Sequence, residues 1–171
     1  MKDQGGPRLP LRIVCNGSSV QREVSPDATL QQFLHDELDD VSVKKGCGEG
    51  VCGSCTVLVD GRSVKSCTML AVQADGRDIT TIEGMAGEDG LHPLQRAFHE
   101  NHGLQCGYCT PGMIMAADSL IRESEGPLDE AGVRIGLEGN LCRCTGYHNI
   151  VKAVLAASET MKAGAPGGGG S

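Results

Sequence analysis

The sequence predicts an α+β fold in which a small sheet, built from hairpins and crossed by one helix, precedes an all-helical segment with four helices. Three observations indicate this arrangement. Alternating apolar segments with Asn-Gly and Asp-Gly turns fill the first half of the 171-residue chain, and helical periodicity replaces them from about residue 90. In addition, eight of the 9 cysteines fall into two sets of four, which indicates metal ligation in each half.

The first half contains two hairpin signals and one helix signal. The Asn-Gly pair at residues 16–17 and the Asp-Gly pair at residues 60–61 are strong two-residue turns, each flanked by alternating segments. Thr29 followed by Gln32 is the pattern of a capping box, and apolar residues after it recur on one helical face. We therefore expect a helix from about residue 30 and strands at residues 11–14, 20–24, 56–59, 64–70 and 78–82.

Four helices are predicted in the second half. Leu91, Leu94 and Phe98 share one face of the first helix, and Gly103 is its expected C-terminal stop. Thr110, which is followed by a proline, is the expected N-cap of the second helix. The other two helices are expected at residues 127–137 and from residue 147 onward.

The first set of cysteines has the spacing of a plant-type ferredoxin cluster. Four residues, two residues and a longer gap separate Cys47, Cys52, Cys55 and Cys67. Glycines in and beside this loop permit positive φ and close backbone approach, so amide N–H groups can point at the sulfurs. Four cysteines can also hold zinc, but zinc ribbons usually present two CxxC knuckles and this loop has one. The spacing therefore favours a [2Fe–2S] cluster.

The second set combines a CxxC with a distant CxC, and this spacing could also hold zinc. Its members are Cys106, Cys109, Cys142 and Cys144. Cys109 and Cys144 each precede a threonine that can cap a helix, so two helix N-termini are expected to point at the metal centre. Their partial positive charge would stabilise an anionic cluster and raise its reduction potential above the roughly −400 mV of plant-type ferredoxins. This placement favours a second [2Fe–2S] cluster.

Composition limits the partners and the compartment. A net charge of −7 without a basic stripe argues against nucleic acid as a partner. No apolar run approaches the ~20 residues that span a membrane, and the first residues lack the apolar core of a signal peptide. Many cysteines without an export signal favour metal ligation in a reducing compartment, so we expect a cytoplasmic protein. The ninth cysteine, Cys15, lies in an alternating strand and is expected to be a small buried hydrophobe.

Four regions are expected along the chain. They are a flexible N-terminus at residues 1–10, a ferredoxin-like β-grasp domain with the first cluster at residues 11–84, an all-α four-helix domain with the second cluster at residues 85–160, and a flexible tail or linker at residues 161–171. The tail ends in four glycines and a serine, which is linker composition. Because the chain has no Trp, 2 Phe and 2 Tyr, its cores must be aliphatic and thin, and the metal sites would serve as staples.

Three segments resemble the small iron–sulfur subunit of molybdenum hydroxylases, the xanthine oxidase family. The segments are residues 46–57 (GCGEGVCGSCTV), 105–113 (QCGYCTPGM) and 139–147 (GNLCRCTGY). The likeness covers about residues 11–157. Residues 63–69 and 102–115 most resemble the small chain of the aerobic carbon monoxide dehydrogenase branch, whereas the first cysteine loop has the form of relatives acting on aldehydes, purines and other N-heterocycles. Carbon monoxide, an aldehyde, a purine and another N-heterocycle therefore all stay open as substrates.

The resemblance implies an electron-transfer subunit of an oxidoreductase with no substrate-turnover site of its own. Electrons would pass from a molybdopterin-type molybdenum cofactor on a large partner subunit, through two [2Fe–2S] clusters, to FAD on a medium partner subunit. The resemblance further implies a dimer of heterotrimers, and contacts to the molybdopterin from the side chain of Gln105 and from the cluster-bound sulfur of Cys144. Two alternatives stay open: a structural or interaction module with two zinc sites, and a free-standing diffusible ferredoxin.

Overall fold

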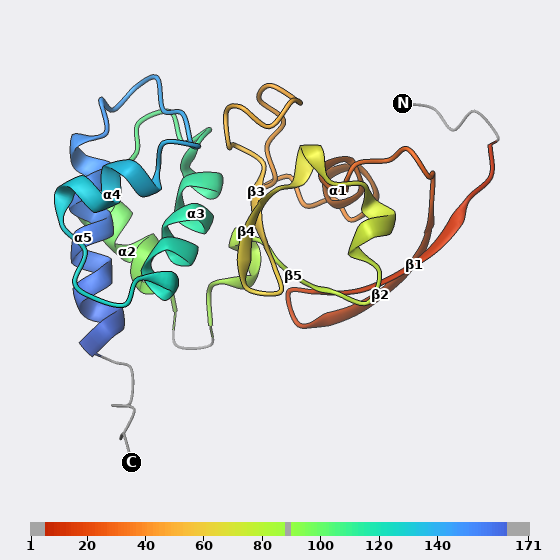
Figure 1. Cartoon of the computed structure of the whole chain (residues 1–171), viewed down its shortest axis with the longest axis horizontal. Helices are drawn as coiled ribbons and strands as arrows, with labels where there is room; N and C mark the ends of the chain where they lie inside the picture. Colours follow the sequence, from red (N-terminus) through yellow and green to blue (C-terminus); the bar gives the residue numbers. More distant parts are fainter. Residues whose placement is uncertain (1–5, 88–89, 164–171) are drawn as a thin grey trace, which may run out of the picture.

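The computed structural model describes residues 6–87 and 90–163, which form a sheet-containing part and a helical part beside it (Figure 1). The strands are β1 (Leu9–Cys15), β2 (Ser18–Val24), β3 (Thr56–Val59), β4 (Arg62–Lys65) and β5 (Asp78–Thr80). The helices are α1 (Leu30–Gln32), α2 (Pro93–Glu100), α3 (Thr110–Glu123), α4 (Glu130–Gly136) and α5 (His148–Ala163). A π-helical turn, η1 (Phe33–Glu37), continues α1, and 3₁₀ turns form η2 (Ser66–Thr68), η3 (Ala71–Ala74) and η4 (Ile82–Gly84).

The five strands form one mixed sheet in the order β2-β1-β5-β3-β4. β1 pairs with β5 in parallel, and the other neighbouring pairs are antiparallel. The Asn-Gly and Asp-Gly pairs at residues 16–17 and 60–61 make the two hairpin turns, and all four residues have positive φ. Thr29 and Gln32 form both halves of the predicted capping box, at 3.2 Å and 2.9 Å. These elements confirm the predicted ferredoxin-like β-grasp.

Two predicted strands are too long. The strand expected at residues 64–70 ends at Lys65, where the 3₁₀ turn η2 begins and leads the chain into Cys67. The N–H and the hydroxyl of Ser66 still donate to the carbonyl of Cys55, at 3.3 Å and 2.7 Å. β5 ends at Thr80 rather than at residue 82, where η4 begins.

The four predicted helices are present, with corrections at their ends. The helix expected at residues 127–137 is α4, which begins only at Glu130, after its N-cap Asp129, and ends at Gly136. Leu91 precedes α2 and is 53% exposed, so it does not share the buried face of Leu94 and Phe98. The left-handed residue after α2 is His102, with φ 52°, and not the expected Gly103. The N–H of Gly103 donates to the carbonyl of Phe98 at 2.8 Å. The N-cap of α3 is Cys109 and not Thr110, whose buried hydroxyl has no hydrogen-bond partner among the described residues.

Each part has its own apolar core. In the sheet part, the core joins buried residues of α1 and η1 to those of the strands, among them Leu11, Leu30, Phe33, Val57 and Ile79. In the helical part, the core lies between the four helices and includes Phe98, Ile114, Ile121, Val133, Ile150 and Val154. Both cores are mainly aliphatic, as the composition predicts, with one phenylalanine in each.

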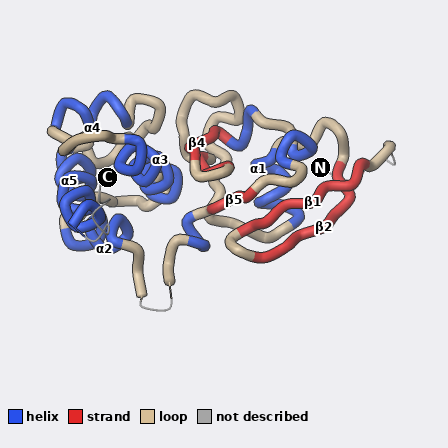
Figure 2. Tube along the Cα trace, turned by 60° about the horizontal axis from the view of Figure 1, so that its bottom comes forward, coloured by secondary structure: helices blue, strands red, loops and turns tan. Residues whose placement is uncertain are grey.

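The two parts meet where α3 packs against β3. At this crossing a Cβ atom on Gly112 would lie 2.2 Å from the carbonyl oxygen of Gly53, and a Cβ on Gly53 would lie 2.4 Å from that of Gly139. Side chains would force these backbones apart, so glycine permits the close approach. The approach brings the loop before β3 to the same end of the molecule as the loops that precede α3 and α5 (Figures 1 and 2).

The segments expected to be flexible fall partly outside the described residues, namely at residues 1–5 and 164–171. Within the N-terminal one, β1 already begins at Leu9. No helix in the described part of the chain is long and apolar enough to cross a membrane.

Candidate metal centres

The first set of cysteines lies in the loop before β3 and in the turn after β4. Cys55 and Cys67 are buried, Cys52 is half-buried and Cys47 is exposed. Backbone amides point at the sulfurs: the N–H groups of Glu49 and Cys52 both donate to Cys47 Sγ at 3.4 Å, and the N–H of Gly50 donates to Cys67 Sγ at 3.3 Å. A Cβ on Gly46 would lie 2.6 Å from Cys52 Sγ, so the backbone itself forms the wall of this cradle.

The environment divides these thiols into two kinds. Hydrogen bonds from the N–H of Glu49, and then from that of Cys52, lower the pKa of Cys47 to about 6. Burial, followed by the neighbouring Cys55 thiol, raises the pKa of Cys67 to about 11. A buried thiolate therefore needs a positive partner, and iron supplies one, while the amides stabilise the negative charge at the exposed end.

The second set lies in the two loops that precede α3 and α5. Cys106 and Cys144 are exposed and their sulfurs are 3.6 Å apart, whereas Cys109 and Cys142 are half-buried. Burial, followed by the Cys142 thiol, raises the pKa of Cys109 to about 12. The expected N-terminus behind Cys144 is wrong in detail, because α5 starts only at His148. The hydroxyl oxygen of Thr145 instead lies 3.1 Å from Cys142 Sγ.

Within each set the thiols influence one another. Cys52 acts on the pKa of Cys47, Cys55 on that of Cys67, Cys142 on that of Cys109 and Cys106 on that of Cys144. A tetrahedral zinc site draws four sulfurs to one centre, whereas a [2Fe–2S] cluster takes two thiolates on each of two irons. The 3.6 Å between the Cys106 and Cys144 sulfurs fits two thiolates on one iron of such a cluster.

The two sets are joined through the backbone. The N–H of Leu141 donates to the carbonyl of Cys52 at 2.8 Å, so one hydrogen bond connects a residue of the first set with the residue before Cys142. Tyr147 supports this loop, because its hydroxyl accepts from the N–H of Cys142 at 2.8 Å and donates to the carbonyl of Asn140 at 3.0 Å. These hydrogen bonds thus connect the loop that carries Cys52 to the loop that carries Cys142.

Two residues at this junction were not predicted from the sequence as part of the site. Asn140 is buried, and its side-chain amide donates to the carbonyls of Gly53 and Gly112 at 3.0 Å and 2.9 Å. Lys65 donates to Asn140 Oδ1 at 2.7 Å, and burial lowers its pKa while the nearby thiols Cys55, Cys52 and Cys67 act in the opposite direction. In the sequence, only their positions two residues before Cys67 and Cys142 indicated a role at the site.

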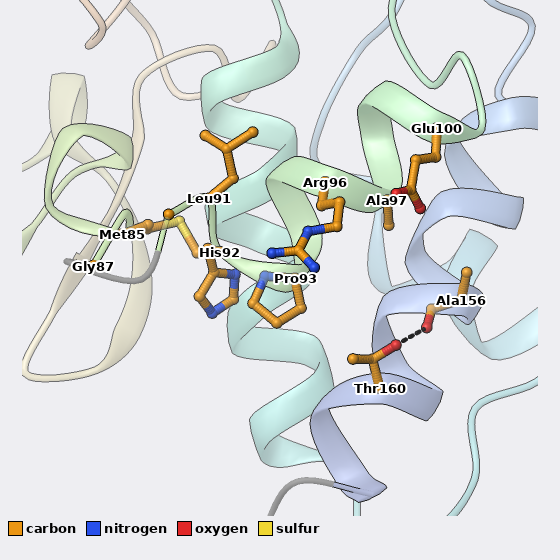
Figure 3. A pocket seen from close by; sticks show the side chains of 11 residues that line it. Met85, Gly87, Leu91, His92, Pro93, Arg96, Ala97, Glu100, Ala156 and Thr160 are labelled. Carbon is orange, nitrogen blue, oxygen red and sulfur yellow. Dashed lines mark hydrogen bonds between the residues drawn. The ribbon is translucent and has the colours of Figure 1, made fainter.

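The remaining candidates lie as follows. Gln105 is exposed beside Cys106, on the side of the second set where Cys144 is also exposed. Cys15 is buried in the sheet core, and burial raises its pKa to about 11, as expected of an inert thiol. A pocket of about 540 Å³ lies between α2, α5 and residues 85–87 and 90–91, and no cysteine is among its described lining residues (Figure 3). The pocket is therefore separate from the metal centres.

Comparison with known proteins gives matches over both halves. A family described as "2Fe-2S iron-sulfur cluster binding domain" matches residues 13–81, and one described as "[2Fe-2S] binding domain" matches residues 81–155. The chain is 44% identical over 155 residues to caffeine dehydrogenase subunit gamma of Pseudomonas sp. (strain CBB1), covering 89% of this chain and 92% of that protein. It is 40% identical over 170 residues to the aldehyde oxidoreductase iron-sulfur-binding subunit PaoA of Escherichia coli (strain K12), covering 90% and 73%.

A solved structure has the same fold. Quinoline 2-oxidoreductase from Pseudomonas putida 86 contains a chain that superposes with a TM-score of 0.85 at 39% identity, covering 92% of this chain and 98% of that one. The matches thus extend across the sheet part, the helical part and the junction between them.

Proposed function

Because the chain belongs to the family of small iron–sulfur subunits of molybdenum hydroxylases, we propose that it carries electrons between two partner subunits of an oxidoreductase complex. The donor would be a molybdenum cofactor on a large subunit, and the acceptor would be FAD on a medium subunit. Both family matches describe [2Fe–2S] domains, so the alternative of two zinc sites is set aside.

The proposed ligands are the two cysteine sets. Cys47, Cys52, Cys55 and Cys67 would hold the first [2Fe–2S] cluster, and Cys106, Cys109, Cys142 and Cys144 would hold the second. The observations that carry this assignment are the backbone amides that donate to the sulfurs of Cys47 and Cys67, and the 3.6 Å separation of the Cys106 and Cys144 sulfurs. Clusters of this kind supply one-electron transfer. The polypeptide supplies the amide donors, the burial and the fixed separation of the two centres.

The exposure of the thiols leaves each cysteine set open to a partner subunit. Cys106 and Cys144 are exposed at the second set, and Cys47 is exposed at the first, whereas Cys52 and Leu141 join the sets in between. A partner at each exposed end would complete the path. We assign the molybdopterin to the second end, where Gln105 would reach it with its side-chain amide and Cys144 with its sulfur.

The remaining expectations stay proposals. We place the boundary between the two cluster domains near residue 84, in the segment between η4 and α2, with domains at residues 11–84 and 85–160. A dimer of heterotrimers is the proposed assembly, and the cytoplasm is the proposed location. None of the nine cysteines forms a disulfide, which favours a reducing compartment. The substrate would be chosen by the large subunit, since no turnover site is assigned to this chain.

The test is purification of the native complex. We expect about four irons per small chain, two per cluster, and both large and medium subunits in the same particle. Addition of the complex's substrate without an electron acceptor should reduce both clusters, which electron paramagnetic resonance would detect as two distinct signals. About two irons would contradict one cysteine set, and a small chain that purifies alone with both clusters would favour a free-standing ferredoxin.

A further inference from the structure

A half-buried lysine lies at the junction of the two cysteine sets. Lys65 ends β4, two residues before Cys67, and its Nζ donates to Thr56 Oγ1 at 3.0 Å and to Asn140 Oδ1 at 2.7 Å. Thr56 directly follows Cys55, and Asn140 lies two residues before Cys142. The ammonium group is therefore held by one residue from each half of the chain, each within two residues of a cysteine of one set.

The position of this charge is fixed by the network around it. The Nδ2 group of Asn140 donates to the carbonyls of Gly53 and Gly112, which orients Oδ1 toward Lys65. Asn140 is 3% exposed, so water competes little for these bonds. A Cβ on Gly139 would lie 3.4 Å from the ammonium nitrogen, so the backbone closes a further side of its site. Lys65 thus differs from an exposed lysine, whose charge moves and is screened.

We propose that Lys65 is a fixed positive charge that raises the reduction potential of the cluster held by the first cysteine set, and more weakly that of the second. Reduction adds an electron to a centre that is already anionic, so a nearby cation stabilises the reduced form. Because Lys65 is partly withdrawn from water, salt and solvent screen this effect less than they screen an exposed charge. The inference rests on the proposed ligand assignment.

The first set is the more strongly affected for a geometric reason. Lys65 lies two residues before Cys67 and donates to Thr56, the residue after Cys55, whereas the second set is reached through Asn140. The alternative is that Lys65 only holds the two halves of the chain together. The reduction potential distinguishes the two roles, because a purely structural role would leave the potential of an intact cluster unchanged.

The test compares Lys65→Gln with Lys65→Arg in the complete complex, by redox titration monitored by electron paramagnetic resonance. Lys65→Gln keeps a hydrogen-bonding side chain and removes the charge, and Lys65→Arg keeps the charge. The matched control is Lys45→Gln, which removes the same charge from an exposed position two residues before Cys47. We expect Lys65→Gln to disfavour reduction of the first cluster about tenfold, a fall of about 59 mV for one electron. The second cluster should shift less, and Lys65→Arg and Lys45→Gln should stay near the wild-type value.

Three results would overturn the proposal. One is an unchanged potential in Lys65→Gln with both cluster signals present, and another is an equal shift in Lys45→Gln. Lys65→Met serves as a second neutral variant; if neither neutral variant retains the first cluster, the lysine is structural and the proposal is wrong. Iron content separates this outcome from a failure of the proposed function, because the wild-type complex would then itself hold fewer than about four irons per small chain.

Discussion

The side-chain amide of Asn140 donates a hydrogen bond to the carbonyl of Gly53 at 3.0 Å, across a separation of 87 residues. The contact links the loop of the first cysteine set to the loop of the second. The same amide also donates to the carbonyl of Gly112 at the start of α3, and its oxygen accepts from Lys65. One buried side chain therefore fixes the relative position of both centres.

Replacing Asn140 should weaken this junction. Asn140→Ala would leave the buried ammonium of Lys65 and the carbonyls of Gly53 and Gly112 without their partner, and we expect a cost of about 3 kcal/mol. For a chain of this size the loss corresponds to a thermal midpoint lower by roughly 6–12 °C. The measurement is the temperature at which the visible cluster absorbance disappears. Asn149→Ala is the control, since Asn149 makes one exposed bond to His102 at 3.4 Å, and an equal fall in both variants would contradict the prediction.

Removing one ligand should damage one cluster. Cys67→Ser should abolish the first cluster and leave the second largely formed, because the two cysteine sets lie in parts with separate apolar cores. Electron paramagnetic resonance of the reduced variant should retain one signal. Cys15→Ala is the control, because Cys15 is buried outside both sets and both signals should persist. Loss of both signals in Cys67→Ser would mean that the two parts fold as one unit.

Gln105 should matter for electron entry and not for cluster formation. Gln105 is exposed beside Cys106, so Gln105→Ala should leave the spectra of both clusters unchanged. We expect slower reduction of the clusters by substrate, because the proposed amide contact to the pterin is lost. Stopped-flow spectroscopy of the complete complex measures this step directly, whereas steady-state turnover can be limited by the flavin. Gln21→Ala, on the exposed side of β2, is the control, and an unchanged rate in Gln105→Ala would exclude the assigned role.

His92 should make stability depend on pH. Burial lowers the pKa of His92 below its ordinary 6.5, opposed by Asp118 and assisted by Arg122. The neutral ring caps α2 by accepting from the N–H of Leu94 at 3.3 Å. Because the unfolded chain binds the proton more readily, stability is retained above about pH 6.5 and falls as the pH drops toward the lower folded-state pKa.

The variant His92→Asn keeps a capping side chain and removes this titration. Thermal midpoints of both proteins, measured between about pH 8 and pH 5.5, should diverge only on the acidic side of pH 6.5, with the wild type falling further. Parallel curves would show that another group controls the acid sensitivity.

The local signals in the sequence predicted most of the fold. The turns at residues 16–17 and 60–61 and the capping box of Thr29 all take the predicted form. These features depend on residues within one or two turns of each other. The errors lie at the ends of elements, as at residues 66–68, where the 3₁₀ turn η2 replaces the end of the expected strand.

The sequence by itself determined the two sets of cysteines and the order of the sheet and helical parts, because thiol spacing and apolar periodicity are properties of short segments. Only the tertiary structure decided which thiols adjoin, how the sets meet and what lies between them. The pairing of Cys106 with Cys144, the bond from Leu141 to Cys52 and the Lys65–Asn140 contact each join residues far apart in the chain. Such contacts follow from how α3 packs against β3 at Gly53 and Gly112, and that close approach of two backbones leaves no periodic pattern in the sequence.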